Sequence, residues 1–162
     1  MMLIRTATYE DLDAIAAVER LCFPPAEAAS REAFADRLRH YADHFWLLFD
    51  GPELIAFVDG MVTDRPDLAD EMYDDAALHQ EDGAWQMIFG VLTAPAHREK
   101  GHAGQLLRRA IADARAQGRR GLVLTCKDAL VPYYAKFGFE DEGASASTHG
   151  GVAWHQMRLT LR

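Results

Sequence analysis

A short loop rich in small and cationic residues offers the clearest chemistry in this 162-residue sequence. It runs from Arg98 to Gly104 (REKGHAG) and joins an apolar segment to a helical pattern. Small residues at a helix entrance let backbone N–H groups approach an anion at the positive end of the helix, and Arg98 and Lys100 add positive charge. The loop therefore favours a phosphate or pyrophosphate ligand, with a plain loop and helix start as the structural alternative. Neither familiar nucleotide motif, G-x-G-x-x-G or G-x-x-x-x-G-K-[ST], is present.

A second group of reactive side chains follows a later apolar segment, in the run CKDALVPYYAKFGF at 126–139. The phenol of Tyr134 could donate a proton, although a tyrosine at such a position more often packs its helix onto a sheet. Cys126 has no basic partner nearby in the sequence except Lys127, so we interpret it as a structural cysteine rather than a nucleophile.

The hydrophobic pattern predicts the elements that must position these residues. Thr8 and Asp11 form a helix-start signature, and Ser30 opens a second helix. The predicted order is β-α-α-β-β-β-α-β-α-β-β, an α+β fold with a mixed sheet and helices on both faces. We expect strands at 3–7, 45–49, 54–62, 85–93, 121–126, 139–145 and 152–160, and helices after Thr8, after Ser30, from Gly101 to Gln117 and at 128–138.

Composition restricts the class of protein. The net charge of −8 argues against a general nucleic-acid binder, which needs a basic face. No apolar run is long enough for a signal peptide or a membrane span. The two cysteines, Cys22 and Cys126, are too far apart for a local metal cluster, and no metal is implied. We expect one domain, residues 1–162, in a soluble cytoplasmic protein.

Two motifs resemble those of a known family. The pattern R-x-x-G-x-A, formed by Arg98, Gly101 and Ala103 after a buried strand, resembles the acetyl-coenzyme A loop of the GCN5-related N-acetyltransferase (GNAT) superfamily. The run at 126–139 resembles the strand-to-helix segment of the serotonin (arylalkylamine) N-acetyltransferase branch. Cys22-Phe23-Pro24, the strand GPELIAFVDG and the closing hairpin fall in the same order. The resemblance implies the acyl-CoA N-acyltransferase fold, a three-layer arrangement with a mostly antiparallel mixed sheet, in which a splay between the strands at 85–93 and 121–126 admits acetyl-CoA.

The resemblance also implies roles for individual residues. The pantetheine arm of acetyl-CoA would follow the backbone of Val91, Leu92 and Thr93, and the Val91 region would hold the developing oxyanion. Tyr134 would protonate the departing thiolate. The remaining cofactor-binding residues implied are Arg98, Glu99, Lys100, Gly101, His102, Ala103, Gly104 and Lys136.

The proton path of the serotonin branch is missing, because Met87 and Phe89 stand where two histidines serve in that branch, and Lys127 replaces an acid. These apolar residues suggest a drier acceptor pocket, for instance for an aromatic amine. The groups that could serve as a base are Glu19, Asp59, His79, His149 and His155, each with a surface or structural alternative. Bulk water is a further alternative. The acidic run between Asp64 and Asp75 is either a solvated face or an entrance that attracts cationic amines.

These observations predict an N-acetyltransferase that moves acetyl directly from acetyl-CoA to the primary amine of a small molecule, such as an arylalkylamine or a polyamine. Within enzymes, a protein N-terminus or a lysine is the second choice. An acyl-CoA-binding module or sensor without catalysis is the alternative from another class, and a partner-binding protein that keeps only the fold is the third. A homodimer is left open.

Overall fold

The computed structural model describes residues 1–147 and 153–162 and contains two compact units. Unit 1 comprises residues 1–60 and 90–110, and unit 2 comprises residues 61–89 and 111–162. The predicted order of strands and helices is confirmed, with a short extra strand and a few single turns added to it. The α+β class with mixed strand pairing is also confirmed.

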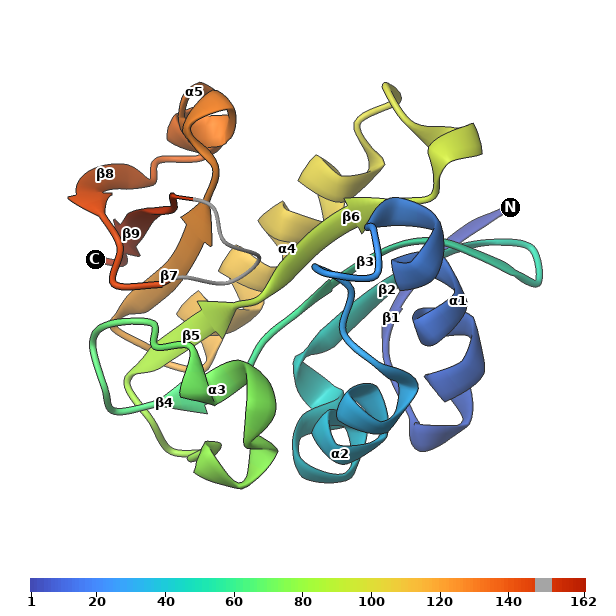
Figure 1. The fold of residues 1–162 in the computed structure, drawn as a ribbon, viewed down its shortest axis with the longest axis horizontal. Coiled ribbons are helices and arrows are strands. Elements are labelled where there is room, and N and C mark those ends of the chain that lie inside the picture. The colour runs from blue at the N-terminus through green and yellow to red at the C-terminus, as the bar shows by residue number, and fades with distance from the viewer. Residues whose placement is uncertain (148–152) are drawn as a thin grey trace. The chain divides into compact units, whose positions relative to one another are not determined.

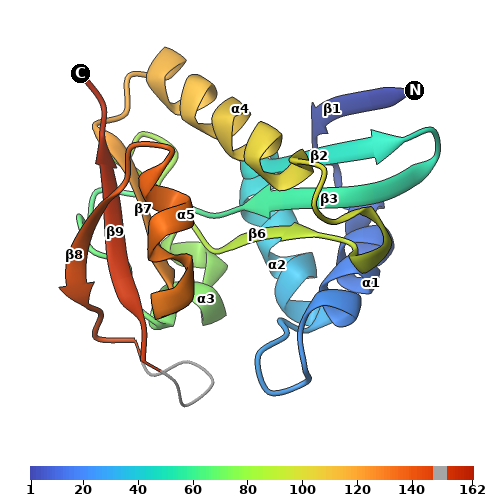
Figure 2. The same cartoon turned by 90° about the horizontal axis from the view of Figure 1, so that it is seen from above.

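The sheet of unit 1 has the strand order β1-β2-β3-β6, and every pairing in it is antiparallel. Its strands are β1 (Met2–Thr6), β2 (Phe45–Asp50), β3 (Glu53–Asp59) and β6 (Gly90–Thr93). Helices α1 (Leu12–Cys22) and α2 (Arg31–Tyr41) cover one face of this sheet, as Figures 1 and 2 show. Phe34 of α2 contacts Phe45 and Phe57 edge-on, which fixes the helix on the strands.

The predicted helix starts of unit 1 are confirmed. Ser30 caps α2, because its hydroxyl accepts a bond from the Ala33 N–H. The backbone N–H of Thr8 donates to Asp11 at 2.8 Å, just before α1. Asp11 also binds Arg5 through two bonds of 2.8 and 2.9 Å, so the start of α1 is tied to β1.

The sheet of unit 2 has the strand order β4-β5-β7-β9-β8, with β5 and β7 parallel. Its strands are β4 (Val62–Thr63), β5 (Trp85–Ile88), β7 (Gly121–Cys126), β8 (Glu140–Ala144) and β9 (His155–Thr160). The acidic segment between β4 and β5 contains the short helix α3 (Glu71–Asp74). After β7, the turn η5 (Asp128–Leu130) leads into α5 (Val131–Ala135), which lies beside β8 and β9 (Figure 2).

Three elements differ from the prediction. The strand expected at 54–62 ends at Asp59, and Val62 belongs to β4 of the other sheet. The apolar segment 85–93 forms two strands instead of one, because Phe89 belongs to neither and the halves join different sheets. The helix expected at 128–138 is shorter, and Gly138 lies beyond its end with a φ of 100°. The predicted closing hairpin is confirmed by the pairing of β8 with β9, and residues 148–152 of its connection lie outside the described residues. Helix α4 (His102–Ala116) matches its predicted range within a residue or two.

Candidate active site

Strand β6 lies at the edge of its sheet, with β3 as its one strand partner among the described residues. The Ala94 N–H donates to the Ile55 carbonyl at 2.8 Å, and the register pairs Leu92 with Phe57. Because antiparallel backbone groups alternate in direction, the N–H groups of Val91 and Thr93 face away from β3. The edge of β6 thus offers backbone groups to an extended ligand at Val91 and Thr93, whereas Leu92 turns its backbone to β3.

The loop after β6 turns sharply into α4. Glu99 has a φ of 67° and Gly101 a φ of 80°, both in the left-handed region. An added Cβ at Gly101 would meet nothing within 4 Å, so the space beside this residue is open. The first N–H groups of a helix have no intrahelical partner, and here they belong to the residues that begin α4 at His102. The loop therefore presents donors to an open space, which is the arrangement that an anion requires.

His102 leaves one polar atom unsatisfied. Its Nε2 is buried and has no hydrogen-bond partner among the described residues. A buried nitrogen without a partner costs free energy, and a bound polar group at the α4 N-terminus would remove that cost.

The carbonyl of Thr93 connects three segments of unit 1. The Cys22 thiol donates to it over 3.3 Å, and the Arg98 Nε donates to it over 3.2 Å. The end of α1 is thereby fixed to the end of β6, and the guanidinium of Arg98 is anchored at one nitrogen. Burial raises the pKa of the Cys22 thiol, so the thiol is neutral at physiological pH.

Glu19, one turn before Cys22 in α1, is the most unusual of the predicted bases. It is 7% exposed, and its carboxylate accepts a 2.8 Å bond from the Ala29 N–H. Burial raises the pKa of Glu19 from 4.5 to about 7. A carboxylate that gains and loses its proton near neutral pH, on a helix packed against β3 and β6, has the property of a general base.

Asp59, at the end of β3, forms a buried ion pair with Arg37 of α2. The Arg37 Nη1 lies 3.1 Å from the Asp59 Oδ2, and their side chains are 6% and 2% exposed. Burial raises the pKa of Asp59 to about 6, which leaves the carboxylate ionised at neutral pH opposite its guanidinium. Asp59 was a predicted base. Its partner Arg37 could not be predicted from the sequence, because the apolar stripe of the helix consists of Phe34, Leu38 and Tyr41 and nothing marks Arg37 as buried.

Tyr134, in α5 of unit 2, is 7% exposed and contacts the rings of Tyr133 and Phe139. Burial raises the pKa of its phenol, so the proton stays on the oxygen throughout the physiological range. Lys136 is exposed and lies over the Tyr133 ring, 5.0 Å from its centre.

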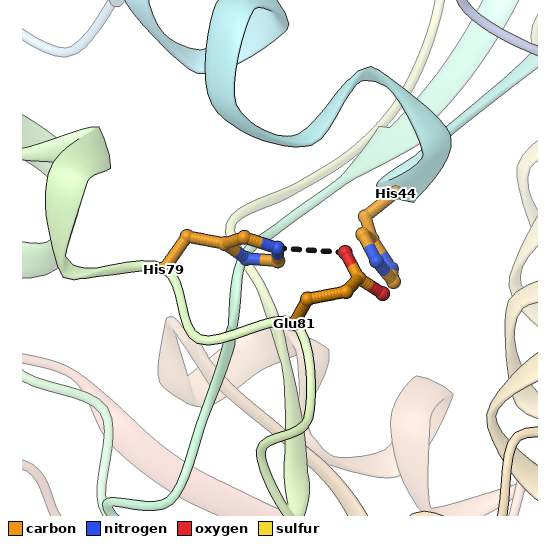
Figure 3. Close-up of side chains that lie close together, drawn as sticks. All are labelled: His44, His79 and Glu81. Carbon is orange, nitrogen blue, oxygen red and sulfur yellow. Dashed lines mark hydrogen bonds and ion pairs between the residues drawn. The ribbon is translucent and has the colours of Figure 1, made fainter.

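The structure gives His79 and His155 structural contacts. The His79 Nδ1 accepts the Val62 N–H at 3.0 Å, and Nε2 points to Glu81 at 2.9 Å, as Figure 3 shows. Because both ring nitrogens are engaged, His79 is a satisfied polar residue of unit 2; His44, also labelled in Figure 3, belongs to unit 1. The ring nitrogens of His155 lie 3.1 Å from Asp128 and 3.1 Å from Asp141. The fifth predicted base, His149, lies outside the described residues.

The two apolar replacements of the expected histidines differ in exposure. Met87 is 0% exposed and packs in the core of unit 2, so it does not line a surface pocket. Phe89 is half-buried and its ring lies 4.6 Å from that of Tyr73. The hydroxyl of Tyr73 shares a 3.2 Å hydrogen bond with Thr125. Sequence reasoning missed Tyr73, which stands in the acidic segment without a motif.

The acidic run of unit 2 makes internal contacts. Asp64 accepts the Ala84 N–H, Asp67 binds Arg158, and Asp70 accepts the hydroxyl of Ser147. These bonds favour a structural role over an entrance for cations. Cys126 is a free, buried cysteine whose thiol donates to the sulfur of Met157 at 3.6 Å, as expected for a structural residue.

Comparisons with known proteins identify the family and the fold. The model of the Acetyltransferase (GNAT) family matches residues 12–139. Serotonin N-acetyltransferase of Mesocricetus auratus is 31% identical over 166 residues, which cover 90% of this chain and 79% of that protein.

Solved structures share the fold. The loading GNATL domain of CurA from Lyngbya majuscula has a TM-score of 0.85 and 15% identity, covering 99% of this chain and 98% of that one. The GphF GNAT-like decarboxylase in complex with isobutyryl-CoA has a TM-score of 0.81 and 22% identity, covering 99% and 100%. The fold and the family predicted from the two sequence motifs are confirmed.

Proposed function

The chain belongs to the GNAT acetyltransferase family, and from that premise we propose that residues 1–162 form one domain that moves acetyl directly from acetyl-CoA to the primary amine of a small molecule. Membership makes the chain an N-acetyltransferase that uses acetyl-CoA. The acceptor, the residues that perform the transfer and a cytoplasmic location are the proposed parts. In support of the location, Cys22 and Cys126 are free thiols, as is usual in a reducing compartment.

One observation carries the proposal: an edge strand with outward-facing N–H groups leads through a left-handed turn into the N-terminus of a 15-residue helix. The residues fit the cofactor, because the unsatisfied Nε2 of His102 at the start of α4 lacks a polar partner and Gly101 leaves room for one. In this proposal the backbone from Glu99 to Gly104 holds the pyrophosphate, with charge from Arg98 and Lys100. Lys136 contributes a further cation.

When bound, acetyl-CoA supplies an activated thioester. The chain positions it through the edge of β6, where the Val91 N–H is the donor available to a developing oxyanion and Thr93 offers the next outward N–H. The backbone of Leu92 pairs with β3, so Leu92 does not offer its N–H to the ligand. Its buried side chain instead packs the strand in place.

Glu19 takes the proton that the amine must lose. A primary ammonium is a poor nucleophile, and a carboxylate with a pKa of about 7 can accept its proton directly or through one water. Glu19 is suited to this role because α1 packs against β6 and its last residue, Cys22, bonds to Thr93. This base replaces the histidine pair that Met87 and Phe89 exclude.

Tyr134 donates a hydrogen bond to the departing thiolate. The buried phenol keeps its proton at physiological pH, which a donor requires. The neighbouring Tyr133 and Phe139 rings hold its orientation.

An aromatic amine is the acceptor that we favour. The half-buried ring of Phe89, paired with Tyr73, offers an apolar surface. The relative of 31% identity is a serotonin N-acetyltransferase, which favours the same class of amine. A polyamine or the N-terminus or lysine of a protein remains the alternative within enzymes, and an acyl-CoA sensor without turnover is the alternative outside them.

The test is a turnover assay that follows thiol release from acetyl-CoA, with the product identified by mass. The acceptors are an arylalkylamine such as tryptamine, a polyamine such as spermidine, and peptides with a free N-terminus or a single lysine. Acetylation of the arylalkylamine at the highest kcat/KM supports the proposal. Turnover with peptides alone would move the assignment to proteins, and binding of acetyl-CoA without turnover of any amine would identify a sensor.

A further inference from the structure

Arg158 of β9 binds the segment 66–73 of unit 2, which leads into α3. Its guanidinium donates to the Pro66 carbonyl at 2.7 Å and to the Asp67 carboxylate at 2.8 Å. The same guanidinium lies over the Trp85 ring, 4.6 Å from its centre, and its side chain is 14% exposed. Because the guanidinium stacks on a ring and binds two groups at once, its orientation is fixed. Arg158 therefore holds the start of the segment on the sheet.

Further bonds fix the segment as it approaches α3. The side-chain oxygen of Gln156, also on β9, accepts the Leu68 N–H at 3.0 Å. The Ser147 hydroxyl donates to the Asp70 carboxylate at 2.5 Å, and the Asp70 carbonyl accepts the Tyr73 N–H at 3.1 Å. The anchoring of the segment thus extends from β9 to the backbone of Tyr73.

The side chain of Tyr73 makes two contacts that define the position of its ring. The ring centre lies 4.6 Å from that of Phe89, and the hydroxyl shares a 3.2 Å hydrogen bond with Thr125. The parallel register of β5 and β7 pairs Ile88 with Leu124, which places Phe89 and Thr125 at the same level of the sheet. Tyr73, Phe89 and Thr125 are each half-buried, so the ring pair is partly open to a ligand.

The ring pair is also linked along the chain to the strand that the proposed function uses. Phe89 directly precedes Gly90, the first residue of β6, and it stands two residues before Val91. Val91 carries the proposed oxyanion donor. A ligand on this ring pair therefore contacts the residue that leads into the strand proposed to hold the thioester.

We propose that Tyr73 is a specificity-determining residue of the amine site, and that Arg158 is a positioning residue that holds the Tyr73 ring against Phe89. This inference rests on the proposed aromatic acceptor. In this account the Tyr73 ring stacks on the aromatic ring of the amine. Arg158 touches neither substrate nor cofactor and acts through the segment 66–73. An alkylamine lacks the ring that Tyr73 contacts, so the site favours an arylalkylamine.

A purely structural role for these contacts predicts a different result. Loss of packing lowers stability and lowers the turnover of every amine in the same proportion. Loss of a stacking partner lowers the turnover of an aromatic amine most. The ratio of kcat/KM for tryptamine to kcat/KM for hexylamine separates the two roles, because a general loss of active enzyme cancels from it.

The experiment compares wild type with Tyr73→Leu, Tyr73→Phe and Arg158→Met, and Arg120→Met is the matched control. Arg120 also lies over the Trp85 ring, 5.5 Å from its centre, but it makes no bond to the segment 66–73 among the described residues. Tyr73→Phe keeps the ring and tests rescue by a conservative change. Thermal unfolding confirms that each variant is folded.

A second readout follows the segment without any amine. Amide hydrogen exchange of Leu68 and Tyr73 reports whether the segment is held, because both N–H groups take part in its anchoring bonds. We expect Arg158→Met to speed this exchange and Arg120→Met to leave it as in wild type.

We expect the kcat/KM ratio to fall about ten-fold in Tyr73→Leu, to stay within about three-fold of wild type in Tyr73→Phe, and to fall about five-fold in Arg158→Met. The fall in Arg158→Met should come from a higher KM for tryptamine, and Arg120→Met should keep the wild-type ratio. Wild-type turnover of tryptamine with an unchanged ratio in Tyr73→Leu overturns the inference alone. No turnover of tryptamine by wild type overturns the proposed acceptor and the inference with it. An unchanged ratio or unchanged exchange in Arg158→Met overturns its positioning role.

Discussion

The carboxylate of Asp59 occupies the space that a side chain at Gly90 would need, with its Oδ1 3.0 Å from the position of an added Cβ. The second close atom, the Leu92 Cδ2, would lie 3.1 Å away. The start of β6 therefore has little room for a side chain, and the first atom in the way belongs to the neighbouring strand β3.

Gly90→Ala should destabilise the fold by about 1–3 kcal/mol, because the extra methyl group must displace Asp59 or Leu92. Thermal and denaturant unfolding measure this change. An unfolding free energy equal to that of wild type would show that Asp59 is not held in place by Arg37.

Glu19→Gln should be more stable than wild type at pH 8 and equal to it near pH 4. Between about pH 4.5 and pH 7, the folded chain keeps a proton on Glu19 that the unfolded chain has released, so wild-type stability falls as the pH rises. The loss is at most about 3 kcal/mol and is absent in Glu19→Gln. Urea titrations at pH 4, 6 and 8 check it.

The same substitution should lower kcat/KM about 10²-fold at pH 8, since it removes the general base. Higher stability with lower activity is the result expected when a carboxylate is buried for its proposed role in the reaction at a cost in stability. Full activity in Glu19→Gln would show that the amine loses its proton elsewhere.

Gly101→Ala and Gly118→Ala form a matched pair. Both glycines have positive φ, 80° and 76°, and in both an added Cβ meets no atom within 4 Å. Their losses in stability should be similar, about 1 kcal/mol each. Only Gly101→Ala should weaken acetyl-CoA binding, by about ten-fold or more, because Gly101 lies in the loop before the N-terminus of α4, whereas Gly118 follows its C-terminal end. Equal affinity in the two variants, measured by calorimetry, would remove the loop from the cofactor site.

Tyr134→Phe should lower kcat by at least about ten-fold and leave the affinity for acetyl-CoA nearly unchanged, because it removes a donor without changing the packing surface. Tyr133→Phe is the control, since its ring neighbours that of Tyr134 in the same helix. If both variants lose equal activity, Tyr134 has only a packing role.

The sequence predicts most strands and helices, because apolar residues recur at the spacing of each element and capping residues mark where helices begin. Ser30 and the pair Thr8 and Asp11 mark helix starts that the structure confirms. The division of the apolar segment at Phe89 is not predictable in this way, because an unbroken apolar run has the same composition whether it forms one strand or two that join different sheets.

The candidate site is predictable only in part. The loop at Gly101 follows from local spacing, which a sequence displays directly. The pairing of Arg37 with Asp59 joins residues 22 positions apart through tertiary packing, which local spacing does not reveal. The raised pKa of Glu19 follows from burial, which a charged residue in a sequence does not reveal either.

The central claim, that the β6 edge and the loop after it hold acetyl-CoA, is tested most directly by calorimetric titration of the purified chain with acetyl-CoA. Dephospho-coenzyme A, which keeps the pantetheine arm and the pyrophosphate, and ATP serve as controls. ATP lacks the pantetheine arm that β6 would bind. We predict one-to-one binding with a micromolar Kd for acetyl-CoA and much weaker binding of ATP. No heat of binding at millimolar acetyl-CoA would contradict the assignment of the site.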